Sequence, residues 1–159
     1  MFIGSDTGSG IINLKTQLSK YLPEDLSTFT NEELNEMFIN ARIQKFREEA
    51  DRYWDIKDSI FHRNWVEFHA ATDQRAKNTY PYCFGDGCRW KWRFDDMDTI
   101  FDTDNQGKAL KEYYVEFFDE GIWNGVTSNF WNLLELAFPE EIKSEMNLFL
   151  RAMEALSPV

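Results

Sequence analysis

The sequence predicts an α+β fold: a mostly helical single domain over residues 1–159, with one small antiparallel β-hairpin at about residues 80–94. Two observations lead to this prediction. Apolar residues recur at spacings of three and four over much of the chain, which is the pattern of amphipathic helices. Around residues 80–94 a tight glycine-containing turn and strict alternation replace that pattern, as expected for a hairpin.

The first helix is expected after a glycine- and serine-rich start. Residues 1–10 hold three glycines and two serines, so we expect them to form a flexible arm. A helix over residues 11–21 follows, with Leu14 and Leu18 among the apolar residues of one face. Pro23 ends it, because the residue before a proline is pushed out of the helical region.

A capping box predicts the start of a long helix. Thr30 and Glu33 have the spacing of that motif, and no glycine or proline follows before about Lys77. A straight helix of about 45 residues would measure roughly 70 Å. A compact domain of this length is only about 40 Å across. We therefore expect a kink or break between Asp55 and Asn64, or a helix that protrudes.

The two cysteines frame the turn of the predicted hairpin. If Gly85 and Asp86 form a two-residue loop, Cys83 faces Cys88 at a non-hydrogen-bonded position. Their Cα atoms then lie about 4.5 Å apart. That distance allows a disulfide, but so few cysteines suit a reducing compartment, where free, packed thiols are expected.

The second hairpin strand places aromatic and basic side chains on opposite faces. We expect Trp90 and Trp92 to be buried against the helices and the basic face to be solvated. The cations of that face are Arg89, Lys91 and Arg93. A cation–π pair between Tyr82 and Arg89 is expected across the strands. In the alternative interpretation, these interleaved aromatic and cationic side chains bind single-stranded nucleic acid.

Three further helices are predicted in the last third of the chain. The first spans about residues 107–120, the second begins at Thr127 or Ser128, and the third begins at Pro139. Two glutamates occupy the first turn of the third helix, where the helix dipole favours acidic side chains.

The overall composition limits the class of protein. Hydrophobic residues make up 43% and aromatic residues 16% of the chain, which excludes intrinsic disorder. A net charge of −11 disfavours direct binding of nucleic acid or of an anionic membrane and attracts basic surfaces. No stretch reaches the roughly 20 apolar residues of a membrane helix, and the N-terminus lacks the pattern of a signal peptide. We expect a soluble cytoplasmic protein.

Two metal-site patterns are present but incomplete. The set His62, His69, Cys83 and Cys88 has the chemistry of a zinc site, but histidines seven apart lie about 10.5 Å apart along a helix. The stretch from Asp102 resembles the start of a calcium loop, but its twelfth position is a tyrosine where a bidentate glutamate is required. We expect neither metal and no cofactor.

No catalytic motif is complete. The string from Asp6 to Ser9 is that of aspartic proteases, which need two copies, and the chain has one. The two histidines lie on one predicted helix, so no Ser-His-Asp or Cys-His arrangement can be argued. We expect no enzymatic activity, and a small metal-dependent enzyme stays open as an alternative.

Charge is distributed unevenly along the chain. Residues 59–94 hold six basic and three acidic side chains, whereas residues 95–145 hold thirteen acidic side chains and three lysines. The second segment therefore carries a net charge of −10. Its densest part predicts a partner-binding surface formed by Asp95, Asp96, Asp98, Asp102, Asp104, Glu112, Glu116, Asp119 and Glu120.

These features predict a non-enzymatic inhibitor that binds and blocks a basic, nucleic-acid-handling protein. Proteins that phages and mobile elements use against CRISPR or restriction nucleases have this size and charge, as does an immunity protein that neutralises a nuclease toxin. This is an analogy of composition alone. A nucleic-acid-binding module that uses the Trp90 and Trp92 hairpin is a further alternative.

Overall fold

The computed structural model describes residues 8–69, 71, 74, 78–97, 100 and 128–156. These residues form five α-helices, two short 3-10 helices and one two-stranded antiparallel sheet. The mostly helical α+β fold with one hairpin is therefore confirmed. The α-helices are α1 (Gly8–Leu18), α2 (Asn31–Glu49), α3 (Ile56–Phe68), α5 (Asn129–Ala137) and α6 (Pro139–Leu156); the 3-10 helices are η1 (Ser19–Tyr21) and η2 (Ala50–Arg52); the strands are β1 (Thr79–Tyr82) and β2 (Lys91–Phe94).

Helix α1 begins earlier than predicted. Its first residue is Gly8, so residues 8–10 of the expected flexible arm are helical, and residues 1–7 lie outside the described part. The helix tightens into η1 and ends where predicted, because Leu22 before Pro23 is extended with ψ 149°.

The capping box at the start of α2 is confirmed. The Glu33 backbone N–H donates to Thr30 Oγ1 at 3.3 Å, and the Thr30 N–H donates to the Glu33 carboxylate at 2.8 Å. Two backbone N–H groups that have no partner within the helix are satisfied in this way.

The break in the long helix lies mostly before the predicted window and ends at its first residue. The chain leaves α2 through η2, Asp55 is extended, and helix resumes at Ile56, so residues 56–64 of the window are continuous helix. The reason is a long-range pairing: Tyr53 and Asp55 bond through their backbones to Trp90, at 2.7 and 2.8 Å. Helix α3 also ends at Phe68, nine residues before the predicted end.

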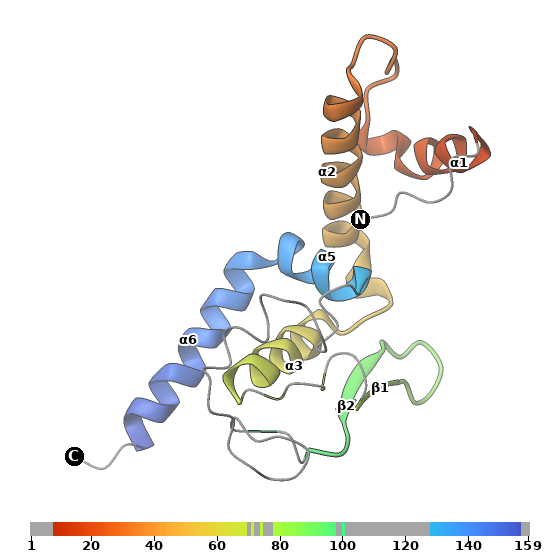
Figure 1. The fold of residues 1–159 in the computed structure, drawn as a ribbon. Coiled ribbons are helices and arrows are strands. Elements are labelled where there is room, and N and C mark those ends of the chain that lie inside the picture. The colour runs from red at the N-terminus through yellow and green to blue at the C-terminus, as the bar shows by residue number, and fades with distance from the viewer. Residues whose placement is uncertain are drawn as a thin grey trace.

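Two separate hydrophobic cores hold the helices together. The small core joins α1 to the first half of α2 through Leu18, Phe38 and Ala41. In Figure 1 this part of α2 and α1 extend away from the remaining elements. The large core joins the end of α2, α3, α5 and α6, and consists of Ala50, Ile56, Ile60, Trp131, Leu134, Ala137, Phe138 and Ile142.

The hairpin has a different register from the predicted one. Tyr82 pairs with Lys91 and Tyr80 with Arg93, which shifts the pairing by two residues and lengthens the turn. Gly85 and Gly87 adopt positive φ angles of 90° and 71°, conformations that glycine allows at little cost. Because the shift is even, each side chain keeps its predicted face.

The last two helices begin as predicted. Ser128 is the N-cap of α5, and Pro139 opens α6 with Glu140 and Glu141 in its first turn. The helix predicted over residues 107–120 lies outside the described residues.

Candidate functional site

The described part of the predicted acidic surface is its beginning. Asp95 and Asp96 follow β2 directly, and both are exposed. The other predicted members lie outside the described residues: Asp98, Asp102, Asp104, Glu112, Glu116, Asp119 and Glu120.

Buried polar side chains fix the backbone under Asp95 and Asp96. The amide of Gln74 donates to the carbonyl oxygens of Asp95 and Asp96, at 2.8 and 3.0 Å. The Asp95 backbone N–H donates to the backbone carbonyl oxygen of Asn78 at 3.0 Å. Gln74 is fully buried, and its backbone carbonyl oxygen lies 2.9 Å from Nε2 of the buried His62. The backbone of the first two residues of the predicted acidic surface is therefore anchored to the interior.

The conformation of Asp96 is unusual for a residue with a side chain. Its φ is +49°, in the left-handed region where glycine is the least strained residue and aspartate is tolerated. In the hairpin turn of the same chain, a residue with positive φ is a glycine, Gly87. An exposed aspartate in this conformation keeps a charge at a position where glycine would relieve strain.

Other acidic residues of the 95–145 segment have internal partners. Glu135 accepts from Arg63 Nε at 3.1 Å, and Glu141 pairs with Arg47 at 2.6 Å. Burial raises the pKa of Glu145. Part of the negative charge of this segment is therefore paired with cations of α2 and α3.

The basic face of the hairpin is largely engaged by carboxylates. Arg89 pairs with Asp51 and lies 3.5 Å from Asp55, and Lys91 also lies 3.5 Å from Asp55. The predicted contact of Arg89 with Tyr82 is wrong, because the guanidinium turns towards these carboxylates. Arg93 is exposed.

Asp55 organises this cluster. Its carboxylate accepts from the Asp58 N–H at 3.2 Å and so caps α3. Burial acts to raise the pKa of Asp55, but the Asp58 N–H and the charges of Arg89 and Lys91 outweigh it and leave the pKa below its ordinary value. Sequence reasoning missed this group, although an aspartate three residues before Asp58 is an N-cap signal.

A hollow of about 630 Å³ opens beside this cluster, and Glu145 of α6 and Phe61 of α3 also line it. Its carboxylates Asp51 and Asp55 already face Arg89 and Lys91. Internal neutralisation of this kind favours a structural role for the cluster over catalysis.

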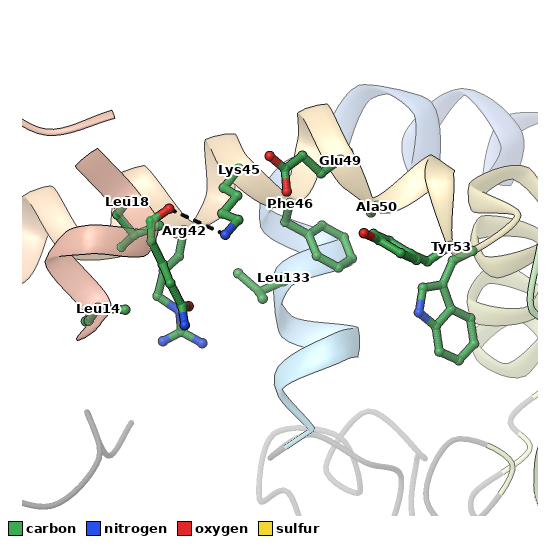
Figure 2. A pocket seen from close by; sticks show the side chains of 11 residues that line it. Leu14, Leu18, Arg42, Lys45, Phe46, Glu49, Ala50, Tyr53 and Leu133 are labelled. Atoms are coloured by element: carbon green, nitrogen blue, oxygen red, sulfur yellow. Dashed lines mark hydrogen bonds between the residues drawn. The ribbon is translucent and has the colours of Figure 1, made fainter. Parts of the chain in front are cut away.

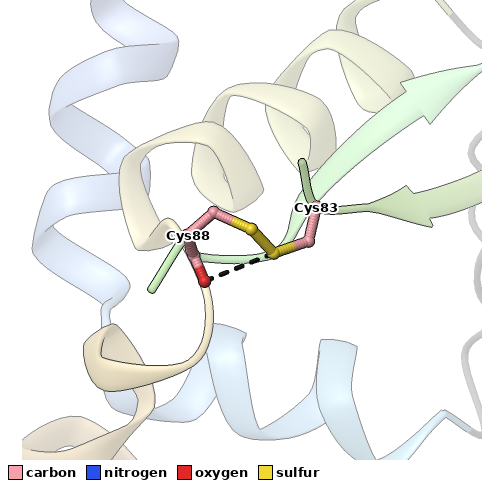
Figure 3. Close-up of a disulfide and its surroundings, with 2 residues drawn as sticks. All are labelled: Cys83 and Cys88. Carbon is pink, nitrogen blue, oxygen red and sulfur yellow. Dashed lines mark hydrogen bonds between the residues drawn. A yellow bond between two sulfur atoms is a disulfide. The ribbon is translucent and has the colours of Figure 1, made fainter. Parts of the chain in front are cut away.

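The cysteines are joined. Figure 3 shows a disulfide between Cys83 and Cys88, whose Cα atoms lie 5.9 Å apart. The prediction that they are neighbours is confirmed, and the prediction of free thiols is wrong. The longer turn sets the Cα distance above the predicted value but within bridging range. Phe84 next to this bridge is 84% exposed.

The histidines belong to the aromatic interior. His62 stacks on Phe94 with ring centroids 4.1 Å apart, and His69 stacks on Trp65 at the same distance. Among the described residues, no three His, Cys, Asp or Glu side chains are grouped to hold a metal ion. The calcium-like stretch from Asp102 lies outside those residues.

The two hairpin tryptophans differ in burial. Trp92 packs against the large core and donates from Nε1 to Ser59 Oγ at 3.1 Å. Trp90 is 43% exposed, so the prediction that both are buried is wrong for Trp90. The difference arises because the backbone of Trp90 pairs with Tyr53 and Asp55 and holds its side chain at the margin of the core.

Comparison with family models, curated proteins and solved structures finds no match for this chain. Within the described ranges, no helix has both the length and the apolar composition needed to cross a membrane.

Proposed function

We propose that the protein is a non-enzymatic inhibitor whose acidic surface, beginning at Asp95, docks on and blocks a basic, nucleic-acid-handling protein. An anti-CRISPR or antirestriction protein and an immunity protein against a nuclease toxin both have this mode of action. The proposal rests on one observation: residues 95–145 carry a net charge of −10 on a chain whose total is −11.

The geometry at the start of this surface supports the proposal. Asp95 and Asp96 are exposed, while Gln74 and Asn78 hold their backbone from below. A charged group on a fixed backbone loses little conformational freedom when a partner binds. Complementary charge also accelerates the encounter with a basic surface.

The exposure of Trp90 favours a second candidate, a nucleic-acid-binding module that uses the hairpin. The ion pairs of Arg89 and Lys91 with Asp51 and Asp55 weigh against it, because those cations are already neutralised. A labelled single strand that binds the protein, and is lost on Trp90→Ala, would favour the hairpin over the acidic surface.

Charge reversal tests the first candidate once the partner has been isolated from the native host and identified by mass spectrometry. Asp95, Asp98, Asp102 and Asp104 are changed to lysine together. We expect a loss of affinity that lies mainly in the association rate, because steering acts before contact.

A matched control reverses four carboxylates elsewhere. Glu24, Glu32, Glu36 and Glu154 are exposed, so their conversion to lysine changes the net charge equally. The control should leave most of the association rate intact, and circular dichroism should show both variants folded. Equal losses in the two variants would mean that only the total charge matters, and would contradict docking through a defined surface.

A further inference from the structure

An apolar groove lies between α1, α2 and α5. Its volume is about 370 Å³, which falls in the range of small-molecule sites. Figure 2 shows Leu14 and Leu18 on one side of it, Phe46 and Ala50 on another, and Leu133 of α5 between them.

The groove lies at the seam between the two cores. Leu14 and Leu18 belong to the small core and its surroundings, whereas Phe46 and Ala50 belong to the large core and its surroundings. Protein interiors normally close such seams by interdigitating side chains. Here apolar surfaces face each other across an open space, and an apolar molecule that fills it would remove both from water.

Cations lie at one end of this apolar space. Arg42 and Lys45 of α2 both line the groove and lie on the side of α1 in Figure 2. The Lys45 ammonium donates to the neutral backbone carbonyl of Gln17 at 3.4 Å, and no described carboxylate lies within ion-pair distance of it. Glu49 also lines the groove, so its charged lining residues are two cations and one carboxylate.

We infer that this groove binds a small amphiphilic anion: an apolar chain or ring that carries one carboxylate. The apolar part would lie against Phe46 and Leu133, and the carboxylate would meet Lys45 and Arg42. Charge-assisted hydrogen bonds to a carboxylate are about twice as strong as neutral ones. An amphiphilic cation meets the same two positive charges and is repelled.

Decanoate is the probe, with decanol and decyltrimethylammonium as matched compounds that differ only in the head group. Titration calorimetry on the full chain, below the micellar concentrations, should show decanoate binding more tightly than decanol, and no binding of the cation. Loss of charge-assisted hydrogen bonds worth about 1.5–3 kcal/mol corresponds to a weakening of about tenfold or more. The double variant Arg42→Gln with Lys45→Gln should bind decanoate about as weakly as decanol.

Arg52→Gln provides the matched control, since Arg52 is an exposed cation of η2 outside the groove. This variant should bind decanoate as the wild type does. Equal binding of decanoate and decyltrimethylammonium, or equal weakening by Arg52→Gln, would overturn the inference.

A variant that fills the groove locates the site. Leu133→Trp should abolish decanoate binding while thermal unfolding stays unchanged. If this variant does not fold, decanoate-induced amide shifts in the wild type should centre on Leu14, Phe46 and Leu133. Shifts centred elsewhere would overturn the inference, and so would the absence of any decanoate binding. If decanoate does not bind and Leu133→Trp is strongly destabilised, another part of this chain, or a second copy, fills the groove. The inference is independent of the acidic surface, so neither result bears on the proposed partner.

Discussion

The small core and the large core are built by different means. The small core has three buried side chains, contributed by helices that are near neighbours in sequence. The large core has eight, and around Trp131 it adds a cluster of aromatic rings brought from α3, α5 and β2. Local sequence signals are therefore sufficient for the first region, whereas the second depends on contacts across the chain.

The largest expected effect separates the two cores directly. Trp131 is 1% exposed and its ring lies 4.7 Å from that of Trp92. Trp131→Ala should cost about 3–5 kcal/mol of unfolding free energy, as large aromatic truncations do. Leu18→Ala should cost about 2–3 kcal/mol. Denaturant unfolding measures both costs.

Hydrogen exchange compares the stability of the two cores helix by helix. In Leu18→Ala the amides of α1 should lose more protection than those of α3 and α5, because Leu18 belongs to the small core. Uniform loss of protection over all helices would show that the two cores unfold as one unit.

A smaller effect is expected from the two tryptophans of the hairpin. Trp92 stacks on Trp54 with ring centroids 4.6 Å apart, whereas the Trp90 side chain is 43% exposed. We expect Trp92→Ala to cost about 3 kcal/mol. Trp90→Ala should cost about 1 kcal/mol or less, since less apolar area returns to water. Comparable costs in urea denaturation would contradict the exposure of Trp90.

A further small effect concerns Asp55, at the junction of α2 and α3. Asp55→Ala removes the cap of α3 and should cost about 0.5–2 kcal/mol. Asp55→Asn keeps a capping side chain but loses the attraction to Arg89 and Lys91. Because the pKa of Asp55 is lowered in the folded state, its charge stabilises the protein above the ordinary carboxyl pKa of about 4.

The stability difference between the wild type and Asp55→Asn should therefore be full at neutral pH. It should shrink as the pH falls below about 4, through the lowered pKa of the folded state. Thermal unfolding from pH 7 to pH 2 measures it. A difference that stays constant over this range would show that the carboxylate is not engaged by these cations.

Sequence reasoning was accurate where a few neighbouring residues decide the structure. The box of Thr30 and Glu33, the stop before Pro23 and the start at Pro139 depend on the backbone of one turn. The hairpin and its two faces also followed from local alternation. Such signals do not depend on what the rest of the chain does.

The errors arose where distant residues decide. Trp90 is 36 residues from Trp54, and only their pairing explains both the early helix break and the exposure of Trp90. In the same way, Arg89 pairs with Asp51, a carboxylate just after α2, and not with Tyr82 as predicted. Of the candidate site, sequence predicted the exposed charges of Asp95 and Asp96 but not the buried Gln74 that fixes their backbone.

In the proposed function, charge on the surface beginning at Asp95 drives docking on a basic partner. The most direct test is the association rate constant with the isolated partner, measured by stopped flow from about 50 to 300 mM salt, over which the Debye length shortens by more than half. We predict a fall of about tenfold or more, as expected for electrostatic steering. A rate that does not change over this range would contradict the claim and would assign recognition to an apolar surface.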